Sequence, residues 1–198
     1  MQRVMLIGDS IRRGYEAIVR KELANEAEVG GPDANCGNSV QILVGIAPWL
    51  LRRDADVVHL NCGLHDLKTI VFGGRENVVP VDHYRRNVHA ILSVLLAHTK
   101  AKSVWATTTP INEANAHRTH AEPRDFDRYE ADVVAYNEAA VDVCKRLGVP
   151  IDDLYAVVMN AGKDGLLKED GVHYTPEGYH TLGRAVAAAI RKQLAASR

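Results

Sequence analysis

The chain places a serine near its start and an aspartate–histidine pair near its end, which together have the chemistry of an ester hydrolase. Ser10 stands in Gly-Asp-Ser-Ile at positions 8–11, directly after an apolar run, and Asp170 and His173 are three positions apart. A serine hydroxyl needs a base to take its proton, and histidine is the usual base because its ordinary pKa lies near neutrality. An aspartate orients the imidazole and stabilises its protonated form. We therefore predict Ser10 as nucleophile, His173 as base and Asp170 as the orienting group.

Acyl transfer also needs hydrogen-bond donors for the oxyanion of the tetrahedral intermediate. The backbone N–H of Ser10 is one candidate, because it is expected at the start of a helix, where the helix dipole favours negative charge. The N–H of Gly37 is a second candidate, since glycine lets a ligand approach the backbone closely.

The elements that must position these residues alternate between strand and helix patterns. Strands are expected at 3–7, 27–29, 56–61, 103–107 and 150–151, and helices at 14–24, 39–52, 82–99, 129–147 and 176–194. This alternation predicts an α/β fold with a flavodoxin-like, doubly wound parallel five-stranded sheet, covered by helices on both faces. Ligands of such sheets bind beyond the carboxyl ends of the strands. Ser10, Gly37, His65 and His173 all follow expected strands, so they are predicted to share one edge.

Two details of this scheme concern the surroundings of the site. The apolar stripe of helix 39–52 is expected to face the core, with Pro48 bending the helix; it consists of Val40, Leu43, Val44, Ala47 and Leu51. Segments 68–81 and 112–127 are irregular and leave the strand ends, so they are expected to shape a substrate cleft. His59 lies inside a strand pattern and is expected to be a core histidine with satisfied hydrogen bonds.

Four short blocks of the sequence resemble the GDSL or SGNH hydrolase family. They are Gly-Asp-Ser-Ile at 8–11, Asn-Cys-Gly-Asn-Ser at 35–39, Gly-Leu-His-Asp at 63–66 and Asp-Gly-Val-His at 170–173, in the family's order. Alone, Ser10 fits a helix N-cap and the last block a surface turn, but their combination favours catalysis. The resemblance implies a three-layer α/β/α sandwich and esterase, lipase, thioesterase or carbohydrate-deacetylase activity, without a metal or other cofactor.

The third block departs from the family pattern Gly-x-Asn-Asp, because His65 stands where the family has an asparagine that donates to the oxyanion. A neutral imidazole has one N–H donor and can take this role in the right tautomer. Asp66 is expected either to fix that tautomer or to cap the local turn. Asp9 is expected either to anchor the loop below Ser10 or to take part in the chemistry.

Composition and charge exclude several classes of protein. With 198 residues, 46% hydrophobic and 25% charged, the chain fits a single soluble domain spanning residues 1–198. A net charge of −1 provides no basic field for nucleic acid or anionic lipid, and no segment is apolar for long enough to span a membrane. The odd count of three cysteines and a first strand that leaves no room for a signal peptide predict a cytoplasmic location.

Two other functions stay open beside the serine hydrolase. A metallophosphoesterase has a Gly-Asn-His-Asp block similar to residues 63–66, but its Asp-x-His opening and late Gly-His-x-His block are absent from the sequence. A non-catalytic flavodoxin-like module would use the same strand ends without pairing Asp170 and His173. The predicted function is a serine-dependent carboxylic ester hydrolase of small-acyl esterase or carbohydrate-deacetylase type. Its partner is a small-molecule ester, and its oligomeric state is not predicted.

Overall fold

Five parallel strands form the central sheet of the computed structural model, which describes residues 1–70, 72, 74–121 and 126–195. The strand order is β2-β1-β3-β6-β8, with bounds β1 Gln2–Ile7, β2 Ala27–Gly30, β3 Val57–Leu60, β6 Lys102–Ala106 and β8 Ile151–Asp152. Val4 of β1 pairs with Val29 on one side and Val57 on the other. This order is that of a flavodoxin-like sheet, so the predicted α/β fold is confirmed.

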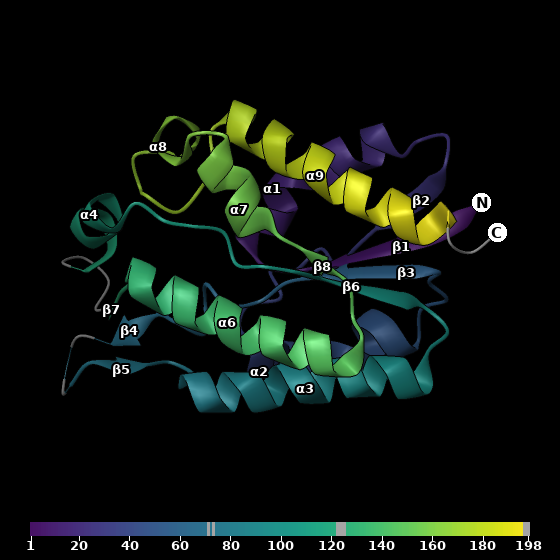
Figure 1. The fold of residues 1–198 in the computed structure, drawn as a ribbon, viewed down its shortest axis with the longest axis horizontal. Helices are drawn as coiled ribbons and strands as arrows, with labels where there is room; N and C mark the ends of the chain where they lie inside the picture. Colours follow the sequence, from purple (N-terminus) through teal and green to yellow (C-terminus); the bar gives the residue numbers. More distant parts are fainter. Residues whose placement is uncertain (71, 73, 122–125, 196–198) are drawn as a thin grey trace.

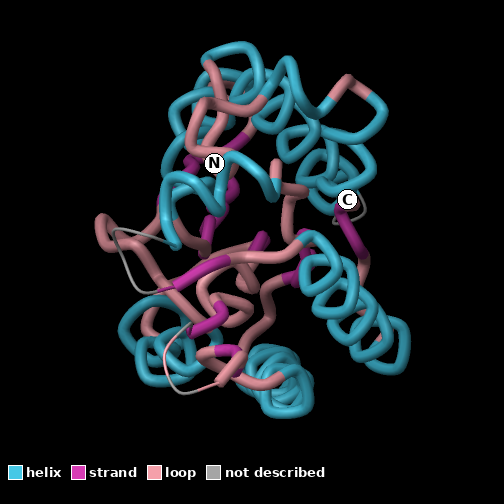
Figure 2. The backbone as a smooth tube through the Cα atoms, turned by 90° about the vertical axis from the view of Figure 1, so that its left-hand side faces the viewer, coloured by secondary structure: helices cyan, strands magenta, loops and turns pink. Residues whose placement is uncertain are grey.

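Helices cover both faces of this sheet and make three layers (Figure 1). One layer holds α1 (Ser10–Glu22), α7 (Leu154–Asn160), α8 (Lys163–Leu166) and α9 (Pro176–Ala195), and the other holds α2 (Ser39–Ile46), α3 (Val81–His98) and α6 (Glu130–Leu147). Figure 2 shows the layers from the side, with the strands between two groups of helices. No helix in the described part of the chain has the length and apolar composition that crossing a membrane requires.

The close packing of α1 against α9 brings the two ends of the chain together. A Cβ atom on Gly14 of α1 would lie 2.1 Å from the ring of Tyr179 on α9, and one on Gly183 of α9 would lie 2.6 Å from Ile18 on α1. Only glycine permits so short a separation between the two helices. Because α1 begins at Ser10 and α9 follows the segment of Asp170 and His173, this packing sets the distance between the predicted catalytic groups.

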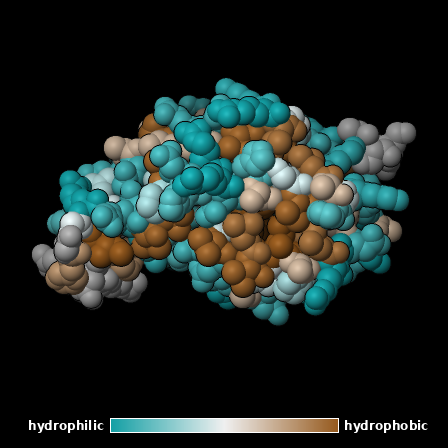
Figure 3. Space-filling view, turned by 90° about the horizontal axis from the view of Figure 1, so that it is seen from below, coloured by the Kyte–Doolittle hydropathy of each residue, from teal (hydrophilic) through white to brown (hydrophobic). Residues whose placement is uncertain are grey.

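Helix α2 turns a different face to the core than its sequence pattern predicts. The helix begins after Asn38, whose side chain forms a reciprocal capping box with Gln41, and it ends at Ile46 before a π-helical turn at Ala47–Leu51. Its buried positions are Ser39, Ile42 and Gly45. Val40 and Val44 are 46% and 81% exposed, so the predicted stripe is wrong. Figure 3 shows the outer side of this layer, with apolar side chains across its middle.

A second, small sheet stands at the end of the molecule toward which the strands of the central sheet run (Figure 1). It has the order β5-β4-β7 and is antiparallel, with β4 at Thr69–Ile70, β5 at Glu76–Asn77 and β7 at Phe126–Asp127. The short helix α4 (Glu113–Ala116) and a π-helical turn at His117–Ala121 precede β7. The two segments expected to be irregular thus contain short elements that pair with each other beside the strand ends.

Candidate active site

Ser10, His173 and Asp170 form a continuous chain of hydrogen bonds. The Oγ atom of Ser10 lies 2.9 Å from Nε2 of His173, and Nδ1 of His173 lies 2.7 Å from Oδ2 of Asp170. Both distances are within the range in which a base can take a proton from a nucleophile and be oriented by a carboxylate. The predicted trio is therefore assembled across 163 positions of sequence.

The turn that carries Asp170 and His173 is held in one conformation. The second oxygen of Asp170 accepts hydrogen bonds from the backbone N–H groups of Val172 at 2.9 Å and His173 at 2.8 Å. Gly171 has a φ of +71°, and a Cβ there would lie 2.4 Å from the carbonyl oxygen of Asn112. Partial burial raises the pKa of Asp170, but these two N–H donors and His173 outweigh it and leave the pKa below its ordinary value. The carboxylate therefore stays ionised beside the imidazole.

Asp9 anchors the loop below Ser10. Its Oδ1 atom accepts a hydrogen bond of 2.9 Å from the N–H of Ile11, which makes Asp9 the N-cap of α1. The side chain is completely buried, and burial raises its pKa despite the N–H of Ile11. The capping bond accounts for one of the two predicted roles of Asp9.

Gly37 lies next to the first block but its N–H already has a partner. The N–H of Cys36 donates to the carbonyl of Gly8 at 3.1 Å, which ties the two segments together. Gly37 has a φ of +64°, and a Cβ there would lie 1.8 Å from the side chain of Gln41. The N–H of Gly37 donates to Oδ1 of Asn35 at 2.9 Å. An oxyanion at this N–H would have to displace the side-chain oxygen of Asn35.

Asp66 contacts Ser39 rather than His65. Its carboxylate accepts hydrogen bonds from the N–H of Ser39, at 2.9 and 3.1 Å, and from the Ser39 hydroxyl. Asn87 of α3 donates to the same hydroxyl at 2.9 Å. Burial raises the pKa of Asp66 to about 6. Asp66 therefore fixes the first residue of α2, a role not predicted from its local sequence.

His65 stands in the loop after β3, where its surroundings keep it uncharged. Burial first, and then the positive charges of Lys68 and Arg128 and the nearby His173, lower the pKa of His65 to about 4. A neutral imidazole retains one N–H donor at neutral pH. The environment of His65 thus favours the neutral imidazole, which is the form predicted to donate to the oxyanion.

Arg128 and Asn35 are neighbours of the site that sequence reasoning missed. Arg128 is 5% exposed, and its Nε donates to the carbonyl of Leu64 at 2.9 Å. Nothing local distinguishes this arginine from the solvated charges around it in the sequence. The Asx-type turn of Asn35 to Gly37, in contrast, has a local signal, because asparagine side chains often accept from the N–H two positions further on.

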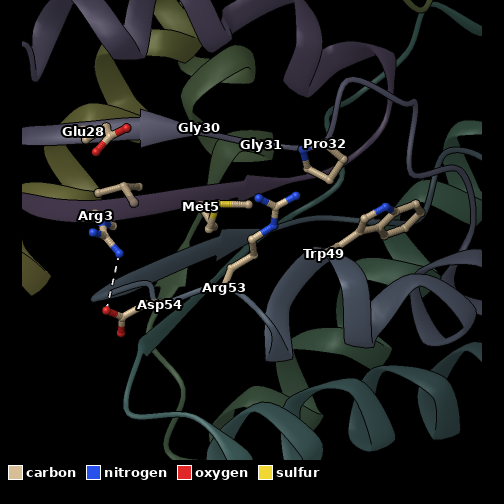
Figure 4. Close-up of a pocket in the computed structure, with 10 residues that line it drawn as sticks. Arg3, Met5, Glu28, Gly30, Gly31, Pro32, Trp49, Arg53 and Asp54 are labelled. Carbon is tan, nitrogen blue, oxygen red and sulfur yellow. Dashed lines mark hydrogen bonds and ion pairs between the residues drawn. The ribbon is translucent and has the colours of Figure 1, made fainter.

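Among the described residues, neither a metal-binding cluster nor the cavity over the first two strands coincides with this group of residues. Within the described ranges, no three His, Cys, Asp or Glu side chains gather as ligands for an ion. A cavity of about 350 Å³ lies over β1 and β2, with Met5, Trp49 and Arg53 on its wall (Figure 4). The predicted catalytic residues do not line it.

Comparison with known proteins assigns the family. The model of the GDSL-like lipase/acylhydrolase family matches residues 6–181, and the chain therefore belongs to this family. Its activity is accordingly that of a GDSL-like esterase or acylhydrolase, which acts on ester substrates. None of the curated proteins compared with the sequence matches it.

Solved structures share the whole fold at low sequence identity. A lipase/acylhydrolase from Enterococcus faecalis has a TM-score of 0.76 and 21% identity, covering 98% of this chain and 97% of that chain. The acetyl xylan esterase AlAXEase has a TM-score of 0.75 and 19% identity, covering 95% and 99%. An acetylxylan esterase from Geobacillus stearothermophilus has a TM-score of 0.76 and 16% identity, covering 96% and 94%. At these sequence identities, the similarity shows a shared fold and nothing finer.

Proposed function

We propose that the protein hydrolyses carboxylic esters through a covalent acyl-enzyme on Ser10. The observation that carries this proposal is the hydrogen-bonded chain from Ser10 through His173 to Asp170, with distances of 2.9 and 2.7 Å. His173 takes the hydroxyl proton as Oγ attacks the acyl carbon, and returns it to the alcohol as the ester C–O bond breaks. A water molecule then attacks the acyl-enzyme, with His173 again as base, and releases the acid and free Ser10.

The oxyanion is held by the N–H groups of Ser10 and Gly37 and by the imidazole of His65. The N–H of Ser10 opens α1, where the helix dipole favours negative charge. Gly37 contributes when Asn35 releases its N–H, and His65 contributes as a neutral donor. Loss of one such donor typically lowers kcat by about 10²–10³-fold. Removing a single oxyanion donor is therefore expected to lower kcat less than removing the nucleophile does.

The substrate is a small-acyl ester, and we favour an acetylated carbohydrate. Two of the structures that share the fold are described as acetyl xylan esterases, and the polar segment that contains α4 leads into β7 of the small sheet beside the strand ends. Polar side chains at the rim suit a hydroxyl-rich alcohol portion better than a long lipid chain.

The test is a panel of activated esters of increasing acyl length, acetylated sugars and acyl thioesters, with Ser10→Ala as control. We expect the highest kcat/KM for acetyl esters and a loss in Ser10→Ala of at least about 10³-fold. Hydrolysis that persists in Ser10→Ala would reject the nucleophile. A preference for long acyl chains would reject the substrate class and leave the nucleophile in place.

A further inference from the structure

Arg128 is a buried cation held rigidly beside the loop of His65. Its backbone N–H donates at 2.8 Å to the carboxylate of Asp127, which is fully buried, and its guanidinium packs over the ring of Phe126 at 5.1 Å. Its side-chain Nε donates to the carbonyl of Leu64 at 2.9 Å. Burying a guanidinium is costly unless its donors and its charge are used. Its position therefore calls for an explanation beyond core filling.

The contact with Leu64 completes the fixation of the loop that carries His65. The carbonyl of Cys62 accepts from the hydroxyls of Tyr84 at 2.8 Å and Thr108 at 3.1 Å. The carbonyl of Gly63 accepts from two N–H groups within the turn, at 2.8 and 2.9 Å. The carbonyl of Leu64, directly before His65, is the one that Arg128 binds. Three consecutive carbonyls thus have hydrogen-bond donors, and the donor to the last comes from the residue directly after β7.

The charge of Arg128 acts on His65 and on Asp9, the residue directly before Ser10. After burial and Lys68, it contributes to the lowered pKa of His65. For Asp9, burial raises the pKa, and the N–H of Ile11 and then the charge of Arg128 oppose that rise. The other charged or titratable groups that act on His65 are Lys68 and His173, while the Asp66 carboxylate accepts from Ser39. A positive charge here disfavours an imidazolium and favours developing negative charge.

We propose that Arg128 is a positioning residue for ester hydrolysis: it holds the carbonyl of Leu64 and thereby places the imidazole of His65 as an oxyanion donor. This inference rests on the role proposed above for His65. Because Nε of Arg128 binds the Leu64 carbonyl, we expect its effect to reach the transition state through His65.

The experiment is a double-mutant cycle between Arg128→Gln and His65→Ala, measured with an activated acetyl ester. Arg128→Gln is expected to lower kcat by about 10–100-fold with KM changed by less than about twofold, as for loss of an oxyanion donor. In the His65→Ala background the same substitution is expected to change kcat by less than about twofold. Equal losses in both backgrounds, or no loss in either, would overturn the proposal.

A second measurement separates positioning from a general loss of structure. The imidazole of His65 is titrated by NMR in Ser10→Ala protein with and without Arg128→Gln, and its pKa is expected to rise when the arginine charge is removed. Arg128→Lys retains the charge without the planar fork, so it is expected to keep the low pKa and still lower kcat. An unchanged His65 titration in Arg128→Gln would contradict the charge effect. Because this readout needs no turnover, it stands apart from failure of the proposed nucleophile.

Arg85→Gln is the matched control for removal of an arginine charge. Arg85 lies on α3 and forms an ion pair of 2.9 Å with Asp142 of α6, with 40% of each side chain exposed. We expect it to leave kcat and the His65 titration unchanged. If Arg85→Gln lowers kcat as much as Arg128→Gln does, the effect is not specific to the loop of His65.

Discussion

His173 and His59 each lie at hydrogen-bond distance from an aspartate, but in opposite surroundings. His173 is 2.7 Å from Asp170, its side chain is 36% exposed, and its other nitrogen meets Ser10 at 2.9 Å. His59 is 2.9 Å from Asp152 and its side chain is 0% exposed. The other nitrogen of His59 has no hydrogen-bond partner in the described structure, so the prediction of a core position is confirmed and that of satisfied hydrogen bonds is wrong for this nitrogen. The ring of Tyr15 stands edge-on at 6.5 Å.

The difference indicates that the place of a histidine–carboxylate pair in the fold decides whether it can serve a nucleophile. His59 lies within β3, where its neighbours are the sheet and α1, whereas His173 lies in a loop beyond the strand ends. We therefore expect substrate to reach the second position and not the first. The two pairs therefore form an internal control, in which similar chemistry is present with and without access to a nucleophile.

Among changes of a single charge, the largest expected effect comes from removing one carboxylate charge from each pair. Asp170→Asn is expected to lower kcat/KM by about 10³–10⁴-fold, because the imidazole loses its orienting charge. Asp152→Asn is expected to leave kcat/KM within about twofold of the wild type, because distant sites act independently. Steady-state kinetics with an acetyl ester measures both. Similar losses in the two variants would break the distinction between them.

The buried carboxylate of Asp66 is expected to affect the pH dependence of stability. Its pKa in the folded protein, about 6, lies above its ordinary value of 3.8. Between these pH values the folded state binds more protons than the unfolded state, so this group's contribution to the free energy of unfolding falls as pH rises. We expect the stability of the wild type relative to Asp66→Asn to fall by up to about 3 kcal/mol from pH 4 to pH 7.

Denaturant unfolding at several pH values measures this difference. His65 acts in the opposite direction, because its pKa is lowered from 6.5 to about 4 and its contribution to stability therefore rises with pH. Subtracting the Asp66→Asn curve from the wild-type curve removes the His65 contribution. A flat difference would show that the Asp66 carboxylate has no raised pKa.

His59→Leu is expected to lower the free energy of unfolding and to leave turnover unchanged, the opposite of what is expected for changes at His173. Asp152 is 7% exposed, so losing its partner leaves a buried carboxylate unsatisfied and lowers the free energy of unfolding by about 1–3 kcal/mol. His173→Leu is the matched control and is expected to abolish turnover with a smaller loss of stability, since His173 is partly exposed. Chemical denaturation measures the free energy of unfolding of both variants, and ester kinetics measures their turnover. Loss of turnover in His59→Leu, or retained turnover in His173→Leu, would contradict the comparison.

The smallest expected effect concerns Asn35. Its side-chain oxygen competes with the oxyanion for the N–H of Gly37, so Asn35→Ala is expected to raise kcat by about two- to fivefold, the worth of one modest hydrogen bond. Asn35→Asp holds the N–H with a charged acceptor and is expected to lower kcat. A fall in kcat for Asn35→Ala would mean that Asn35 orients this N–H for catalysis instead of occupying it.

Much of the site could be predicted because its signals are local. Ser10 follows a strand, and Asp170 and His173 lie within one turn, so the rule that ligands bind at strand ends sufficed to bring them together. The flavodoxin-like parallel sheet followed from the alternation of elements. The proposed oxyanion roles of Gly37 and His65 stay predictions.

The contacts that sequence reasoning missed join residues far apart in the chain. Asp66 and Ser39 are 27 positions apart, and Arg128 and Leu64 are 64 positions apart; neither pair has a periodic or local signal. The prediction of which face of α2 is buried was wrong for a different reason. Its sequence is apolar on nearly all sides, so periodicity could not separate Ile42, which is buried, from Val44, which is 81% exposed.

The most direct test of the central claim is covalent labelling with a serine-reactive phosphonate, followed by peptide mass spectrometry. We predict one adduct, on Ser10, that forms at the wild-type rate in Asp152→Asn and at least about 10²-fold more slowly in Asp170→Asn, since the attacking hydroxyl depends on the oriented base. An adduct on another residue, or equal labelling rates in the two aspartate variants, would contradict the account.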